Sequence, residues 1–173
     1  MKPMRRPDPS EYNPYYLRYV DTVPDEDLVV FLARQASHLE ARLALVPAHR
    51  EAFCYEPGKW SIREVVGHIS DTERVFAYRL LHFARQDPAV LPGMDQDTFM
   101  AGSRFGERTL ASIAGEFATV RAATISLVTS LTPEETDRIG VASGFKFTVR
   151  ALTWIIAGHA QHHLNVLAER YHA

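Results

Sequence analysis

The sequence predicts an all-α domain, a bundle of four helices. Apolar residues recur at i, i+3 and i+4 in four long segments, as they do on the buried face of a helix. No segment shows a convincing period-two alternation of the kind that a half-buried strand has. The 173 residues are 46% hydrophobic and 23% charged, which fits one domain with a sizeable core. We therefore expect residues 1–173 to form a single domain, whose helices cover residues 25–45, 61–86, 107–130 and 148–171.

Capping residues support the helix starts. Ser61 and Glu64 form the pattern S-x-x-E just ahead of an apolar run, a capping box at the start of the second helix. Thr148 is a plausible N-cap of the fourth helix. A minor turn of helix is expected at Thr132, with Pro133 at its first position. These signals place the helices at the intervals given above.

The connection between the second and third helices, residues 87–106, is long and rich in turn residues. Extended at about 3.3 Å per residue, it can span the length of a helix and make these two helices parallel. Connections of this length inside a compact domain are often functional, so we expect it to form a pocket wall or, alternatively, a surface loop with its own short helix.

Residues 1–23 are expected to form an arm that packs on the body of the domain. Four prolines break any long helix there, and four tyrosines make the segment too aromatic for a free tail. The start of the chain lacks an apolar run typical of a secretory signal.

Charge and cysteine content fit a cytoplasmic protein, for which we expect small-molecule partners and neither nucleic acid nor membrane. A net charge of −2 gives no electrostatic reason to bind nucleic acid or an anionic membrane. No uninterrupted apolar run reaches the ~18 residues of a membrane span. Cys54 is the single cysteine, so no internal disulfide can form. It lies beside Phe53 and Tyr55, and packing is a commoner role for such a residue than nucleophilic catalysis.

The fourth helical segment carries the pattern HxxxH. His159 and His163 fall in the middle of its apolar stripe, and residues four apart share one helix face. Two such imidazoles suit two ligands of one metal ion. A buried pair with other hydrogen-bond partners explains the pattern equally well. His68, in the second turn of the second helix, points about 60° from the centre of its stripe, toward a neighbouring helix. If the second and fourth helices are adjacent, His68 completes a set of three.

Two sequence blocks identify a family resemblance. Residues 57–73 read PGKWSIREVVGHISDTE and residues 158–163 read GHAQHH, with LPGMDQD at 91–97 between them. In this order they resemble the DinB-like superfamily over nearly the whole chain. The resemblance implies a four-helix bundle with up-down-down-up topology, often a homodimer. It also implies a divalent metal ion held by His68, His159 and His163.

The resemblance further implies a choice of chemistries. Some relatives transfer substrates to or from low-molecular-weight thiols such as bacillithiol or mycothiol, and many are thought to be metal-dependent hydrolases. Three neutral imidazoles leave a divalent ion with its full charge and an open position, at which the pKa of water or a thiol falls. Zinc, nickel, iron and manganese all tolerate imidazole. Ala160 stands where a zincin has its glutamate, so the HxxxH itself provides no general base.

Other residues are weaker candidates. Beside the metal ligands, His162 is expected at the surface or supporting the ligands, and Asp71 either orients an imidazole or is a solvated carboxylate. Arg79 could hold a substrate carboxylate, although a buried ion pair is the commoner role. Trp60 and Tyr55 are expected to pack over the start of the second helix. The remaining histidines are expected to be exposed: His38, His49, His82 and His172.

Two classes of function follow. The first is a metal-dependent enzyme, a thiol transferase or a hydrolase, that acts on a small molecule. The second is a DinB-like binding or stress-response module without turnover, in which the metal is structural. The residues name no substrate, and a fold alone cannot supply one.

Overall fold

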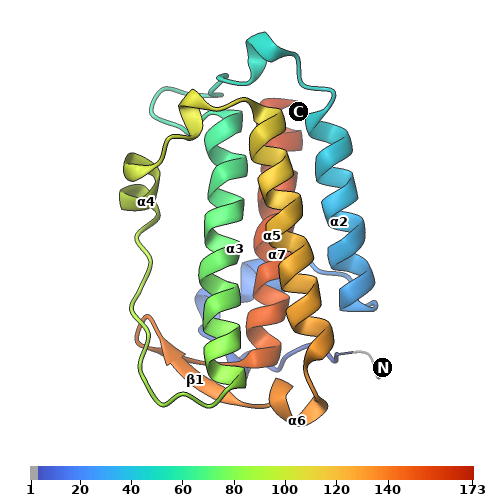
Figure 1. Ribbon diagram of the computed structural model, residues 1–173, viewed down its shortest axis with the longest axis vertical. Coiled ribbons are helices and arrows are strands. Elements are labelled where there is room, and N and C mark those ends of the chain that lie inside the picture. The colour runs from blue at the N-terminus through green and yellow to red at the C-terminus, as the bar shows by residue number, and fades with distance from the viewer. Residues whose placement is uncertain (1–3) are drawn as a thin grey trace.

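The computed structural model describes residues 4–173 and shows a bundle of four long helices (Figure 1). The long helices are α2 (Leu28–Leu43), α3 (Ile62–Ala84), α5 (Leu110–Ser130) and α7 (Val149–Val166). The short elements are α1 (Leu17–Val20), α4 (Gln96–Gly102), α6 (Pro133–Thr136), β1 (Ile139–Ala142) and β2 (Phe145–Thr148), with 3-10 turns at Pro9–Glu11, Pro14–Tyr16, Ala48–Arg50 and Phe105–Glu107 and a π-helical turn at Leu167–Tyr171. The predicted all-α bundle is therefore the observed fold.

The helix starts are capped as their residue types require. Ser61 accepts a hydrogen bond from the backbone N–H of Glu64, and Glu64 Oε2 accepts one from Ser61 N at 2.7 Å. Thr148 Oγ1 accepts from Ala151 N at 3.0 Å at the start of α7. Thr132 caps the short α6. Each cap satisfies backbone donors that a helix end would otherwise leave unpaired.

The four long helices run up, down, down and up (Figure 1). The connection from α3 to α5 returns along the outside of α3 and carries α4, so α3 and α5 are parallel. α7 then runs antiparallel to α3 and packs against it, and α3 and α2 both pack against α5. This is the topology that the long connection and the family resemblance predicted.

A short hairpin corrects the expectation that the chain has no strand. β1 and β2 pair antiparallel, with Ile139 opposite Thr148, and Leu91 of the long connection adds a bridge to Ala142. Strands of four residues are too short for a period-two pattern to stand out. Ser143 and Gly144 form the turn with φ of 54° and 80°, the left-handed region that two-residue hairpin turns require. The hairpin closes the end of the bundle at which α7 begins (Figure 1).

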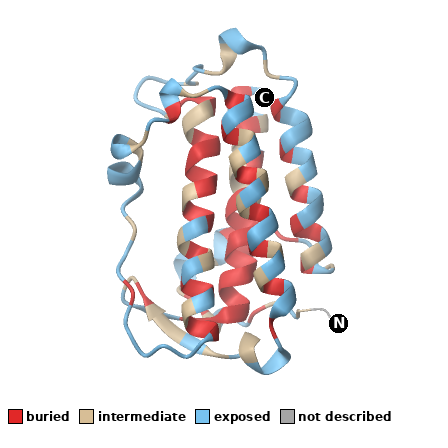
Figure 2. Ribbon diagram, viewed as in Figure 1, coloured by how far each residue is buried: buried red, intermediate tan, exposed pale blue. Residues whose placement is uncertain are grey.

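The core consists of two hydrophobic clusters with a polar layer between them. Buried residues follow the inner faces of the long helices (Figure 2). Each long helix contributes apolar residues to both clusters and carries at least one buried polar side chain near the change from one to the other. The polar residues of this layer are Gln35, His68, Thr72, Glu73, Arg121, Thr124 and His159.

Part of the polar layer is a closed structural network. Arg121 donates to both carboxylate oxygens of Glu73, at 2.8 and 2.7 Å, and to Gln35 Oε1 at 2.7 Å. Gln35 in turn donates to the carbonyl of Ala157 at 3.0 Å and to Gln161 Oε1 at 3.1 Å. The buried charges are thus paired, which removes most of the cost of their burial. The network ties α2, α3, α5 and α7 together at the level of the histidines.

The N-terminal arm packs on the bundle over the residues that the structure describes; residues 1–3 of the expected arm lie outside them. Tyr12, Tyr19, Val20 and Val23 are buried in the core cluster next to α7. The arm brings three tyrosines to the face of the bundle where the histidines lie.

By length and composition, α5 is apolar enough to cross a membrane, with a mean hydropathy of 1.2. Core helices of soluble bundles pass the same test.

Candidate metal centre

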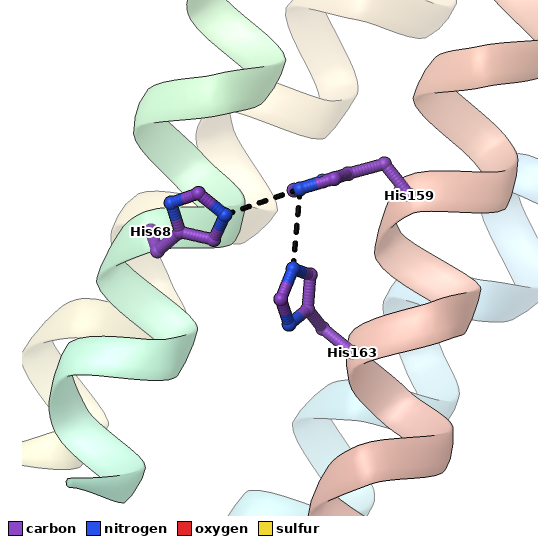
Figure 3. Close-up of side chains that lie close together, drawn as sticks. All are labelled: His68, His159 and His163. Carbon is purple, nitrogen blue, oxygen red and sulfur yellow. Dashed lines mark hydrogen bonds between the residues drawn. The ribbon is translucent and has the colours of Figure 1, made fainter. Parts of the chain in front are cut away.

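Three histidine side chains converge between α3 and α7 (Figure 3). His68 comes from the second turn of α3, whereas His159 and His163 lie one turn apart on α7. The Nε2 atom of His159 is 3.2 Å from Nε2 of His68 and 3.2 Å from Nε2 of His163. One ring nitrogen from each residue lies within 4.8 Å of the other two. The structure therefore brings together the three histidines that the sequence singled out.

These distances fit a metal ion better than hydrogen bonds among the rings. A neutral imidazole Nε2 carries either one hydrogen or one lone pair, so it makes one well-directed hydrogen bond. His159 Nε2, however, faces two other nitrogens at the same distance. Nitrogens at 2.0–2.1 Å from a tetrahedral ion are about 3.3 Å apart. The cluster suggests a metal ion, and the three side chains fit one.

Burial keeps the three imidazoles neutral. Desolvation lowers the pKa of His68 to about 4 and that of His163 to about 3. Desolvation also lowers the pKa of His159 well below its usual value, and the neighbouring histidines add to the effect. A neutral ring keeps a lone pair on one nitrogen, which is the form that binds a metal ion.

Thr72 orients His68, a role that the sequence prediction missed. Its Oγ1 lies 3.3 Å from His68 Nδ1. A hydrogen bond from the Nδ1–H to this hydroxyl leaves the Nε2 lone pair free to face the cluster. Asp71, which we considered for this task, instead pairs with Arg74 at 3.4 Å, and desolvation raises its pKa. The sequence did contain a signal for this contact: Thr72 lies one turn after His68, and residues four apart share a helix face.

Aromatic rings enclose the cluster. The ring of Trp60 lies 4.8 Å from that of His68, and the ring of Tyr19 packs edge-on against His159 at 5.3 Å. Phe76 contacts His159 from α3 at 6.2 Å. These rings limit the access of bulk water and hold the imidazoles in place. Trp60 was expected to pack over the start of this helix, and it does so against a candidate ligand.

Two cavities meet at the cluster. The first, which we call the arm cavity, has a volume of about 270 Å³ and is lined by His68, His159, Arg79 and the tyrosines of the arm. The second, the C-terminal cavity, has a volume of about 330 Å³ and is lined by His163, His162, Lys59, Trp60 and Tyr171. Gln96 at the start of α4 lines both. The long connection is therefore a wall of both cavities, as predicted.

The structure places the other candidates at the edges of this site or outside it. His162 is half-buried, packs on Tyr19 at 5.4 Å between ring centroids, and stays outside the cluster. Tyr55 lines the C-terminal cavity. Cys54 is exposed, which corrects the expectation that it is a packing residue. His82 was expected at the surface, but its side chain is only 8% exposed. Its Nε2 instead faces the carbonyl oxygen of Ala89.

Arg79 also departs from the expected ion pair. It is 3% exposed, and no carboxylate within residues 4–173 forms an ion pair with it. Its Nη2 donates to the carbonyl of Pro92 at 2.9 Å and to Ser143 Oγ at 3.1 Å. The guanidinium thus lines the arm cavity without a paired carboxylate among the described residues.

Solved structures share the fold. The chain matches YfiT from Bacillus subtilis, described as a probable metal-dependent hydrolase with an unusual four-helix bundle topology, at a TM-score of 0.75 and 14% identity over 87% of this chain and 90% of that one. It matches a mycothiol-dependent maleylpyruvate isomerase at 0.66 and 11% identity, over 84% of this chain and 61% of the isomerase. A DinB-like protein of Bacillus subtilis, YjoA, matches at 0.60 and 19% identity, over 82% and 88%.

Sequence comparison identifies the family. A search of curated proteins finds no match. The model of the DinB superfamily matches residues 15–167, which include α1 to α7 and all three histidines of the cluster. The chain belongs to the DinB superfamily.

Proposed function

We propose that this protein is an enzyme that depends on a divalent metal ion held by His68, His159 and His163. We further propose that it transfers a low-molecular-weight thiol to or from a small electrophilic substrate. The observation that carries the proposal is the position of the cluster, where three neutral imidazole nitrogens meet at the boundary of two cavities. A divalent ion there supplies a Lewis acid that lowers the pKa of a thiol or of water.

The residues of the chain have distinct tasks in this proposal. The three histidines present Nε2 lone pairs toward one point, and Thr72 fixes the ring of His68 through Nδ1. Trp60 and Tyr19 shield the cluster on the sides of the two cavities. Shielding from water strengthens electrostatic interactions with a bound substrate.

Two cavities favour transfer between two molecules over hydrolysis. A hydrolase needs room for one organic substrate and a water molecule, whereas a thiol transferase must seat a thiol and an electrophile on either side of the reacting atoms. The cavities have similar volumes and share Gln96. Hydrolysis is the second candidate, and the description of YfiT favours it, while that of the isomerase favours a thiol-dependent reaction. A binding or stress-response module without turnover is the third.

Metal analysis of untagged protein tests the site. We expect one divalent ion per chain in the unmutated protein and none in His163→Ala, because two nitrogens hold an ion far more weakly than three. His162→Ala is the matched control: the neighbouring histidine lines the same cavity but lies outside the cluster, so its metal content should be unchanged. Unmutated protein without metal would refute the proposed centre.

Turnover then separates the three functions. The metal-loaded protein is incubated with a small electrophile and a panel of low-molecular-weight thiols that includes bacillithiol and mycothiol. Consumption of both thiol and electrophile supports a transferase. Consumption of an ester or amide without thiol supports a hydrolase, and no turnover of either kind supports the binding module.

A further inference from the structure

Arg79 differs from the other buried arginines of this protein. Arg121 is fully buried and bonds both oxygens of Glu73, and the buried Arg150 bonds Glu11 and Asp137. Arg79 is equally hidden, at 3% exposure, yet within residues 4–173 its polar contacts are a carbonyl and the hydroxyls of Ser143 and Tyr16, none of them a carboxylate. Proteins rarely bury a guanidinium without a negative partner. The partner of Arg79 is therefore to be sought outside the described residues.

The guanidinium is held in a fixed position. Pro92, from the long connection, and Ser143, from the tip of the hairpin, both accept hydrogen bonds from Nη2. Ser143 adopts φ of 54°, a conformation that favours Asn or Gly over Ser. Serine at this turn position supplies the hydroxyl that accepts from Arg79. The ring of Phe76 lies 5.5 Å from Arg79 Cζ. These contacts orient Arg79 in advance of any ligand.

Arg79 faces the same cavity as the histidines. It lines the arm cavity together with His68 and His159. The Cα of Arg79 lies about 16 Å along α3 from that of His68, so the guanidinium and the cluster lie toward opposite ends of this cavity. Asp95, the one acidic side chain among the described residues that line this cavity, caps α4 by accepting a hydrogen bond from Thr98 N at 2.7 Å. The cavity thus has a positive end and a metal-binding end.

We propose that Arg79 binds a carboxylate of the substrate, so that the arm cavity selects small organic acids. The acid group lies at Arg79, and the reacting part of the molecule lies toward the three-histidine cluster. A guanidinium binds carboxylates through charge-assisted hydrogen bonds, which are stronger than neutral ones. The placement of the reacting part of the substrate at the cluster rests on the proposed function, whereas the carboxylate site at Arg79 does not.

Calorimetric titration tests the anion site. The probes are propionate and succinate, with propionamide and succinamide as uncharged counterparts of the same shape. The acids are expected to bind and the amides to bind at least tenfold more weakly. Arg79→Gln is expected to lower the affinity for the acids at least tenfold, and Arg79→Lys by less. Arg74→Gln, which removes one positive charge from an exposed position on the same helix, should leave the affinity unchanged.

The titrations are run on metal-free and on zinc-loaded protein, because carboxylates also bind metal ions. Binding that depends on Arg79 in the metal-free protein, and persists in His163→Ala, supports the anion site even if the metal proposal fails. Equal affinity for acid and amide, binding that needs zinc and ignores Arg79, or equally tight binding of inorganic phosphate would overturn it. If Arg79→Gln does not melt cooperatively, the anion site is tested by Arg79→Lys and by the difference in affinity between acid and amide in the unmutated protein.

Discussion

Among single residues, His159 and Thr72 explain most about the centre. His159 Nε2 is the atom to which the other two histidines come closest, and it lies on the helix that the arm covers. Thr72 acts on the opposite side of the cluster, where its hydroxyl can accept a hydrogen bond from His68 Nδ1–H and so supports the tautomer that leaves Nε2 free. Such supporting hydrogen bonds fix the orientation of a ligand and raise its basicity.

Replacement of Thr72 by valine should weaken metal binding without disturbing the fold. Valine keeps the shape but removes the hydroxyl, so His68 Nδ1 loses its partner, and the dissociation constant for zinc should rise by about 10- to 100-fold. Competition with a chromogenic chelator measures this constant. Thr72→Ser, which retains the hydroxyl, is the control and should bind zinc nearly as well as unmutated protein. An unchanged constant in the valine variant would remove Thr72 from the centre.

Among the elements, the contact between α1 and α7 sets how close the arm lies to the cluster. Gly158 precedes His159, and a Cβ at this position would overlap the carbonyl carbon and oxygen of Tyr19. Thr22 reinforces the contact because its hydroxyl donates to the Tyr19 carbonyl at 2.7 Å. The absence of a side chain at Gly158 is what allows the ring of Tyr19 to reach His159.

Gly158→Ala should therefore destabilise the protein, although alanine is the better helix former. The overlapping atoms belong to the backbone of α1, so the arm must shift, and overpacking of this kind costs about 1–3 kcal/mol. Gly115→Ala is the matched control: it lies in α5 with open space around it, and should stabilise by about 0.5–1 kcal/mol. Urea unfolding measures both. Equal stabilisation by the two substitutions would contradict the close approach.

For the whole molecule, the arm joins the N-terminal part of the chain to the last long helix. Glu11 accepts hydrogen bonds from Thr148 Oγ1 at 2.7 Å and from Arg150 Nη2 at 2.7 Å, so the arm is fastened to the start of α7. Burial alone would raise the pKa of Glu11, but hydrogen bonds from Arg150, the Asp8 backbone and Thr148 outweigh it and lower that pKa. The carboxylate form of Glu11 is thus favoured by folding.

This lowered pKa predicts a pH dependence of stability. The contribution of Glu11 is fully present above its unfolded pKa of about 4.3 and is lost as pH falls through the lower folded pKa. Glu11→Gln should be less stable than unmutated protein by about 1–2 kcal/mol at pH 7, and the difference should shrink toward pH 3. Urea unfolding at pH 7, 4 and 3 measures it, with Glu40→Gln on the exposed face of α2 as control. A difference that stays constant down to pH 3 would contradict the assigned pKa.

Features set by neighbouring residues were predictable from the sequence. Helical periodicity and the capping residues Ser61, Thr132 and Thr148 located the helices to within a few residues, because caps and apolar faces are local. The convergence of His68 with the HxxxH pair followed from inward positions on two helices, once these were taken as adjacent.

Features set by distant partners were not predictable. Arg79 reads as half of an ion pair, and only the structure shows that Pro92 and Ser143 surround it in place of a carboxylate. The exposure of Cys54 depends on which side of the loop before α3 meets the bundle. The hairpin at 139–148 forms because it closes over the end of the bundle, where Phe147 is buried, and four-residue strands carry little signal of their own.

The origin of the cluster in two helices far apart in the chain has a consequence for its biosynthesis. His68 and His159 are separated by 91 positions. At a synthesis rate of about 5–20 residues per second, the ribosome needs roughly 5–20 s between the two. A nascent chain that ends before α7 holds one of the three imidazoles and lacks the helix that buries it. Coordination of an ion by all three histidines is therefore possible only after translation has passed α7.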